Sequence, residues 1–486
     1  MAQTRRQFLV HAGCGTLSAS ALLSGLGRFA LIDTLAQSQP PSGYKALVCV
    51  FLFGGNDANN MVIPYTNYSD YSNVRGSANF AIPQSDLLQI TPPSSGATFG
   101  LNPKLGDSFD VNPSLKALWD QNRAAIVCNT GPLIRPFADR SDYLSGAARP
   151  YQLFSHSDQQ NAWQTSYATR PKQTGWGGST VDQTGGSGGN FPAVASLSGV
   201  TVFSTGQNTR PLVLSPAPTP LNATLKLFKY GNNPPEQAIM DALMFDGQDP
   251  MPALVQGAAQ ITKSALDASA ALNANPTLVT KFPSTTLGNQ LAQIAKLMSL
   301  APQLGVNKQV FFASLGGFDT HTGQGQYQGP GSNGGQLGLL SQLSQAVGSF
   351  YAATVELGIS NQVTLFTSSD FSRTFVPGGG STGTDHAWGS HQFVVGDAVA
   401  GGDFYGQYPS LNLGTDQDTD GGANPRGRWI PTTSVDQYAA TLADWYGLAP
   451  GDRNTVFPNI NQFSPQTLGF MSGGATPMTS RRAKRG

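Results

Sequence analysis

The chain has 486 residues, and its 28 basic residues balance 28 acidic ones, so the formal net charge is zero and only 12% of the residues are charged. No basic field is present to hold a polyanion, which excludes nucleic acid as a partner. Beyond the N-terminus no run is long and apolar enough to cross a bilayer, so we expect no membrane span in the mature protein.

An export signal opens the chain. Thr4-Arg5-Arg6-Gln7-Phe8-Leu9 is a twin-arginine pattern, and a mildly apolar stretch and small residues near Ala36 follow it. This order predicts a signal peptide over residues 1–36, export by the twin-arginine translocon, and a periplasmic or secreted mature protein. A cytosolic protein with a chance arginine pair is the alternative.

Downstream, apolar runs typical of buried strands alternate with helical patterns. The runs lie at 45–53, 124–128, 309–313 and 362–366, and the helical patterns begin at Asn112-Pro113, Gln336 and Ser434. This alternation predicts an α/β fold, with helices on both faces of a mostly parallel central sheet. We expect a single domain over 37–470, a helical insertion covering the sheet edge at 200–305, and a flexible basic tail over 471–486.

Three aspartates each follow a strand-like run by a few residues. They are Asp57, Asp319 and Asp370. In open α/β sheets the working residues collect beyond the carboxyl ends of the strands, so these carboxylates are expected to meet at one edge.

The histidines are concentrated in the same places. His11 lies in the signal peptide, and the mature chain has only His156, His321, His386 and His391, each inside a short polar cluster. Histidine is the commonest metal ligand, and hydrolytic sites hold ions with imidazole and carboxylate together. We therefore predict one or two divalent ions (Zn, Mn, Mg or Ca), although an isolated Asp-x-His is more often hydrogen-bonded structure.

Two further residues are candidates for the chemistry. Ser155 is a candidate nucleophile, with Thr320 or a water at the metal as rivals, and it is equally a candidate helix cap. Arg373, three residues after Asp370, is suited to grip an anionic oxygen in a bidentate manner, and an ordinary ion pair is the alternative.

Several motifs together resemble one family. They are the twin-arginine leader, Phe51-Leu52-Phe53-Gly54-Gly55-Asn56-Asp57, Ser155-His156, Gly316-Gly317-Phe318-Asp319-Thr320-His321, Ser369-Asp370-Phe371-Ser372-Arg373-Thr374, Gly383-Thr384-Asp385-His386-Ala387-Trp388-Gly389 and Ile430-Pro431-Thr432-Thr433-Ser434-Val435-Asp436. In this order they look like the bacterial exported family catalogued as domain of unknown function 1501, over nearly the whole mature chain.

That family resembles the alkaline phosphatase and sulfatase superfamily, and the resemblance implies an α/β core with two divalent ions. By analogy Asp57 and Asp370 would serve one ion, while Asp319, His321 and His386 would serve the other. The superfamily usually has a histidine after the last of these aspartates, and this chain has Phe371 there.

Two functions from different classes follow. The first is an exported metal-dependent hydrolase of a phosphate or sulfate ester, on a small molecule or attached to a polymer. The second is a non-catalytic exported protein that keeps the fold and one structural metal, and that serves in binding or surface assembly.

Overall fold

The computed structural model describes residues 43–472, apart from 77–78, 186–190, 225–268, 270–271, 273–275 and 379–381. The expected signal peptide at 1–36 and nearly all of the expected tail at 471–486 lie outside the described residues. Much of the block at 200–305 lies outside them as well.

A mixed, mostly parallel sheet forms the centre of the molecule. Its strand order is β11-β5-β10-β9-β1-β8-β6-β7, with β12 also paired to β5, and β10 is antiparallel to both of its neighbours. The strands are β1 (Lys45–Leu52), β5 (Ala124–Gly131), β6 (Val194–Ser196), β7 (Leu212–Val213), β8 (Lys308–Leu315), β9 (Val363–Ser369), β10 (Ser390–Val395), β11 (Phe404–Tyr405) and β12 (Thr433–Ser434). The four apolar runs correspond to β1, β5, β8 and β9, which confirms the predicted α/β class.

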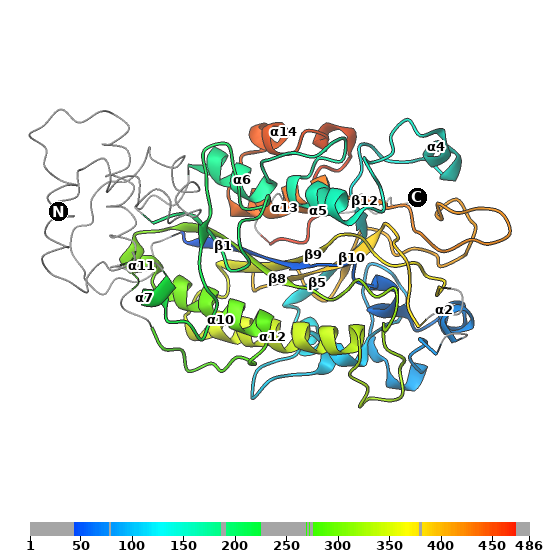
Figure 1. Cartoon of the computed structure of the whole chain (residues 1–486), viewed down its shortest axis with the longest axis horizontal. Coiled ribbons are helices and arrows are strands. Elements are labelled where there is room, and N and C mark those ends of the chain that lie inside the picture. The colour runs from blue at the N-terminus through cyan, green and yellow to red at the C-terminus, as the bar shows by residue number, and fades with distance from the viewer. Residues whose placement is uncertain are drawn as a thin grey trace, which may run out of the picture.

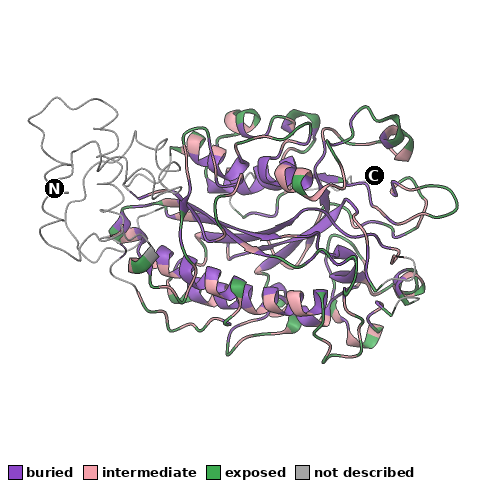
Figure 2. Cartoon of the chain, viewed as in Figure 1, coloured by how far each residue is buried: buried purple, intermediate pink, exposed green. Residues whose placement is uncertain are grey.

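Helices cover both faces of this sheet (Figure 1). α5 (His156–Thr165), α6 (Trp176–Thr184) and α13 (Val435–Tyr446) lie on one side, and α10 (Thr286–Ser299) and α12 (Gln336–Glu356) lie on the other. The strands between these layers are buried almost throughout, as Figure 2 shows. No helix among the described residues combines the length and the apolar character that a bilayer crossing requires.

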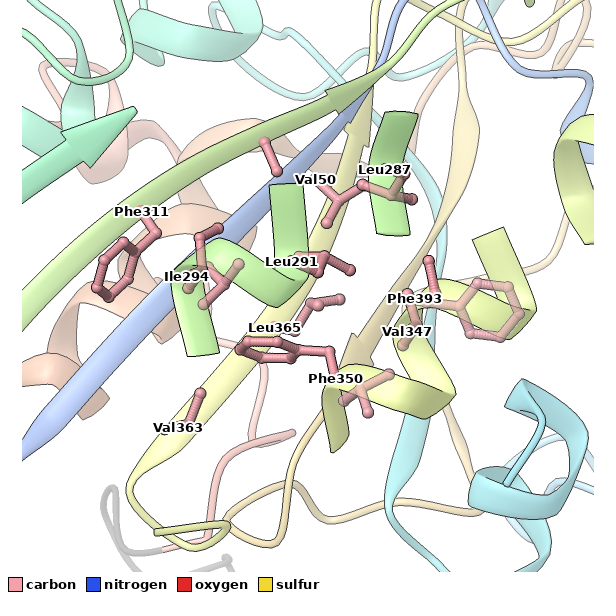
Figure 3. Close-up of a cluster of buried hydrophobic side chains, with 14 of the residues drawn as sticks. Val50, Leu287, Leu291, Ile294, Phe311, Val347, Phe350, Val363, Leu365 and Phe393 are labelled. Atoms are coloured by element: carbon pink, nitrogen blue, oxygen red, sulfur yellow. The ribbon is translucent and has the colours of Figure 1, made fainter. Parts of the chain in front are cut away.

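Side chains of β1 alternate between two hydrophobic cores, one on each face of the sheet. Val48 and Val50 join the cluster that contains Leu291 and Phe350 (Figure 3), whereas Cys49 joins the cluster on the α13 side. Successive side chains of a strand point to opposite faces, so an almost continuously apolar strand is buried on both. Each such side chain stabilises the fold by about 1.5–3 kcal/mol when fully buried. The sheet is therefore a rigid support for the loops at its strand ends.

Shorter elements complete the described chain. They are a separate antiparallel sheet of β2 (Val62–Pro64), β4 (Phe99–Leu101) and β3 (Leu88–Ile90), and the helices α2 (Tyr68–Arg75), α3 (Leu115–Asp120), α4 (Arg140–Ser145), α7 (Leu221–Thr224), α11 (Ala301–Leu304) and α14 (Arg453–Val456).

Two of the three helices expected from the sequence begin where their sequence patterns predicted. α12 begins at Gln336, and α13 has the capping box of Ser434 and Gln437 that its sequence predicted. The expected start at Asn112-Pro113 was wrong by two residues, because the Ser114 hydroxyl accepts the Ala117 N–H and caps α3 instead. The Asn112 amide donates to the Lys281 carbonyl oxygen, 2.9 Å away.

The described part of the block at 200–305 contributes to the sheet and to its helical cover. β7 pairs with β6 at the sheet edge, and α10 packs against α12 and β8. The large apolar side chains of α10 belong to the same core as Val48 and Val50 of β1. This part of the block therefore belongs to the sheet and to its helical cover.

Candidate metal site

Three neighbouring parallel strands bring the candidate carboxylates to one edge. β1 lies between β8 and β9 and pairs with both in parallel, so the loops that follow these strands share an edge. The Gly54 N–H, after β1, donates to Asp370 Oδ1, after β9, over 3.2 Å. Arg373 connects Gly54 to Asp319, after β8. The three strand-end segments are therefore in direct contact.

Four side chains form a compact group at this edge. They are His156, Asp319, His321 and His386, and their ligand atoms all lie within 4.8 Å of one another. Asp319 Oδ1 lies 3.4 Å from His156 Nε2, 3.3 Å from His321 Nε2 and 3.7 Å from His386 Nε2. The Asp319 and His321 side chains are 50% and 45% exposed, so solvent reaches the group from one side.

The second nitrogen of each histidine is held by an acceptor. Nδ1 of His156 lies 2.7 Å from Asp370 Oδ2, Nδ1 of His321 lies 2.9 Å from Asp385 Oδ1, and Nδ1 of His386 lies 2.7 Å from a backbone carbonyl. Carboxylates and carbonyls only accept, so in each neutral imidazole the proton is on Nδ1 and the lone pair is on Nε2. All three Nε2 lone pairs consequently face the common centre.

This arrangement could hold a cation. His321 Nε2 and His386 Nε2 are 2.8 Å apart, and two lone pairs at that distance repel unless a proton or a metal ion lies between them. His156 Nε2 is buried and has no hydrogen-bond partner among the described residues. Ligand atoms bound to one ion at 2.0–2.1 Å in a tetrahedron would be roughly 3.3 Å apart, close to the three distances from Asp319. The donor set therefore fits a single divalent ion.

The surrounding charges tune these groups in different directions. Burial alone would raise the pKa of the Asp319 carboxyl, but Arg373 and His156 hold it below its usual range. The hydrogen bond to Asp370 raises the pKa of His156, whereas burial lowers the pKa of His386. The Asp319 side chain is accordingly anionic at neutral pH.

Arg373 is a buried neighbour of the group. Its Nη1 donates to Asp319 Oδ1 over 3.0 Å and to the Gly54 carbonyl over 3.2 Å, and its Nη2 donates to the Thr384 carbonyl. A short antiparallel bridge also pairs its backbone with that of His386. The ion pair considered from sequence is thus present, and it is made to the carboxylate of the group.

Asp370 supports a histidine instead of joining the group. Its Oδ2 accepts from His156 Nδ1 and from Gln160 Nε2, 2.8 Å away, and its side chain is fully buried. Asp370 therefore lies beside the group as the partner of His156, where it fixes the ring of His156 and its tautomer.

We predict that Asp370→Asn weakens binding of a divalent ion by about 10–100-fold, because an amide supports the imidazole less well than a carboxylate. Titration of the apo protein with Zn²⁺, followed by calorimetry, measures this change. An affinity equal to that of the parent would contradict the role of Asp370 as support for His156.

Asp57 lies at the same edge but is bound to other groups. Arg75 donates to both of its carboxylate oxygens, at 2.5 and 3.0 Å, and Gln324 Nε2 donates to Oδ2. Asp57 also caps the short helix that begins at Ala58. Because its oxygens are already paired with a cation, we do not include Asp57 among the proposed ligands.

Phe371 directly follows Asp370 and packs beside two histidines of the group. Its ring lies 4.9 Å from the ring of His156 and 4.6 Å from that of His386, centroid to centroid. This residue contributes an apolar wall that restricts the two imidazoles, and it supplies no ligand atom.

His391 is not brought to the group. It lies in β10, its Nδ1 accepts the Asn129 N–H over 3.1 Å, and its ring stacks on Tyr408 at 4.9 Å. Tyr408 also lines a cavity of about 740 Å³ that has none of the four group members in its lining. His391 lies on the buried strand β10, whereas His386 lies in the loop before that strand. The two histidines therefore face different environments, although they are only five residues apart.

The burial of His391 predicts a pH dependence. Burial lowers its pKa from 6.5 to about 3, so the unfolded chain takes up a proton below pH 6.5 that the folded chain refuses until about pH 3. The folded state loses stability as pH falls through this window, by at most about 1.4 kcal/mol per pH unit. His391→Asn, which keeps an acceptor for Asn129, should have a flatter dependence between pH 6 and 4. Urea unfolding of both proteins tests this, and equal slopes would contradict it.

Ser155 occupies the N-cap position of α5 without making a capping bond. Its hydroxyl donates to Asp158 Oδ2 over 2.7 Å and lies 3.3 Å from the Ser157 hydroxyl. The rival Thr320 is buried, and its hydroxyl donates to Gln324 Oε1. Neither contact decides the nucleophile, so the assignment of Ser155 stays a prediction.

Sequence reasoning missed the outer partners of the histidines. Asp385 is next to the predicted histidine His386 in sequence, yet it bonds to His321, 64 residues away. The third partner is the carbonyl of Phe154, a backbone group that carries no sequence signal. The position of Asp385 beside His386 in the sequence could have marked it as a candidate partner. Which histidine it bonds to depends on how the loops pack.

The model of the family described as "Protein of unknown function (DUF1501)" matches residues 44–420. A solved structure described as "Crystal structure of Ps i-CgsB in complex with k-i-k-neocarrahexaose" is 9% identical over 85% of this chain and 74% of that chain, with a TM-score of 0.31. No curated protein matches.

Proposed function

The chain belongs to the DUF1501 family of proteins of unknown function, and we propose that it is an exported metal-dependent hydrolase of a phosphate or sulfate ester. The observation that carries the proposal is the gathering of three imidazole Nε2 atoms and one carboxylate around a common centre, with His321 Nε2 and His386 Nε2 only 2.8 Å apart. The donors that would hold the ion are His156, Asp319, His321 and His386. Imidazole-rich sets favour zinc over Mg²⁺ or Ca²⁺, which prefer oxygen ligands.

A divalent ion held by these residues would act as a Lewis acid that polarises an oxygen of the ester. Arg373 holds the Asp319 carboxylate in place and puts a fixed positive charge beside the group. The half-exposed side chains of Asp319 and His321 leave the group accessible to a substrate.

The charge balance favours an anionic substrate. The carboxylates at the group are those of Asp319, Asp370 and Asp385, and the guanidinium groups are those of Arg373 and Arg426, which pairs with Asp385. A divalent ion more than compensates for the excess carboxylate, and the resulting positive centre attracts an anion from solution. Phosphate and sulfate esters, free or attached to a polymer, have that charge.

Ser155 is the proposed nucleophile. It precedes His156 in the chain, and its hydroxyl already donates to the Asp158 carboxylate, the arrangement in which a carboxylate accepts the proton of an attacking hydroxyl. Thr320 and a water molecule are the rivals.

The export and the finer fold class are parts of the same proposal. The twin-arginine leader supports export, and it lies outside the described residues. Three strand-end carboxylates gathered at one sheet edge support an alkaline phosphatase-like fold.

A specific observation also favours the non-catalytic reading. Four protein ligands are the number found in closed structural zinc sites, whereas catalytic zinc sites usually keep one position for water or substrate. In that case the group would stabilise the strand-end loops, and the protein would serve in binding or surface assembly.

Metal analysis and an ester panel separate the two functions. Protein purified without chelator is analysed for bound metal and assayed on small phosphate and sulfate esters, before and after removal of the metal. Hydrolysis that is lost with the metal and returns with Zn²⁺ supports the hydrolase. Bound metal without hydrolysis supports the structural reading, and protein that binds no divalent ion contradicts both.

A further inference from the structure

Arg75 and Asp57 form a completely buried ion pair. It lies at the sheet edge that carries the four-residue group of Asp319 and the three histidines. The guanidinium comes from the last residue of α2, and both side chains have an exposure of 0%. Nη1 donates to Asp57 Oδ2 over 2.5 Å and Nη2 donates to Asp57 Oδ1 over 3.0 Å. This two-pronged geometry is the strongest that a guanidinium and a carboxylate make.

The groups around the guanidinium form a pocket for a cation. Besides the two Asp57 oxygens, Nη2 donates to the Thr374 carbonyl oxygen over 3.1 Å, and the guanidinium carbon lies 5.5 Å from the Phe375 ring centroid. Three oxygen acceptors and an aromatic face all favour positive charge. A buried carboxylate in this position would be strongly destabilising without a cation beside it.

A second metal ion does not fit this edge. The two-ion arrangement implied by the resemblance would use Asp57 and Asp370. Asp57 is occupied by Arg75 and Gln324, Asp370 Oδ2 by His156 and Gln160, and residue 371 is a phenylalanine without a ligand atom. The residues present therefore hold one ion and not two.

We propose that the Arg75 guanidinium takes the place of a second divalent cation, so that the protein works with one exchangeable metal ion per chain and one permanent organic cation. The count of one ion rests on the proposed function, whereas the charge role of Arg75 does not. The permanent cation neutralises Asp57 and keeps the loop after β1 in position beside Asp319 at any metal concentration.

The first test is a count of metal ions. The parent and Asp57→Asn, which removes the charge and keeps the volume, are equilibrated with Zn²⁺ and dialysed, and the metal per chain is determined. Both should hold one ion. Two ions in the parent and one in Asp57→Asn would overturn the proposal, because Asp57 would then be a ligand.

The second test is a thermodynamic cycle on unfolding. Arg75→Met removes the charge and should lower the Tm, and so should Asp57→Asn. The double variant should be more stable than either single variant, because neither buried charge is left alone. The matched control is the surface pair Lys116–Asp120, where Lys116→Met and Asp120→Asn should each have little effect and should add.

The two tests fail independently. Effects of Arg75→Met and Asp57→Asn that simply add would overturn the charge role of Arg75, whatever the metal count. A parent that holds no ion would refute the proposed function and leave the cycle to decide the role of Arg75. If Arg75→Met does not fold alone, recovery of folded protein in the double variant supports the coupling, and failure of the double variant while Asp57→Asn folds contradicts it.

Discussion

Asp319→Asn is expected to lose most of its bound divalent ion and all measurable ester hydrolysis. The substitution keeps the volume of the side chain and removes the only charged ligand of the group, whose oxygen lies 3.3–3.7 Å from the three Nε2 atoms. The loss of affinity should exceed the roughly 10–100-fold that follows loss of an outer partner. Metal content after dialysis and the rate on the best ester of the panel measure both effects.

Two matched variants define this result. Asp416→Asn makes the same chemical change at an exposed aspartate and should retain metal and activity. Ser155→Ala should lose hydrolysis and retain the metal, because a nucleophile contributes chemistry rather than affinity. Full activity in Ser155→Ala would shift the attack to Thr320 or a water molecule. Full metal content in Asp319→Asn would mean that the three histidines suffice and that Asp319 is not a ligand.

The sequence was informative where one strong local signal fixed the outcome. The apolar runs predicted β1, β5, β8 and β9, and parallel pairing of β1 with β8 and β9 then brought their strand-end loops together. Asp319 and His321 follow β8, so their place at this edge could be expected from the fold class alone, whereas His156 reaches it at the start of α5 and His386 in the loop before β10.

The different roles of the three carboxylates could not be predicted from the sequence in the same way. Asp57, Asp319 and Asp370 each follow one of the parallel strands. Arg75, at the end of α2, pairs with Asp57, and His156, at the start of α5, pairs with Asp370. Which carboxylate remains for a metal depends on how these helices dock, and that is a property of tertiary packing. β10 was missed for a related reason, since Ser390-His391-Gln392 begins it with polar residues that only a buried hydrogen-bond network accommodates.

Gly54→Ala is expected to destabilise the fold and to disrupt the metal group together. Gly54 has a φ of +111°, and a Cβ there would lie 2.2 Å from the backbone nitrogen of Asp319 and 2.7 Å from the carbonyl carbon of Phe318. Strain of the backbone costs about 1–3 kcal/mol, and overpacking against another backbone costs about as much again. The segment that must shift carries Asp319, and a displacement of about 1 Å at a reactive group can cost roughly 100-fold in rate.

The control variant Gly358→Ala separates backbone strain from overpacking. Gly358 also has a positive φ, of +68°, but a Cβ there meets no heavy atom within 4 Å in the described part of the chain. It should show the backbone strain alone, with a modest fall in Tm and unchanged metal content. Gly54→Ala should show a larger fall in Tm and lose metal. If both variants kept their metal and fell equally in Tm, the close approach of the loops after β1 and β8 would not be what positions Asp319, and the rigidity of the group would have to come from Arg373.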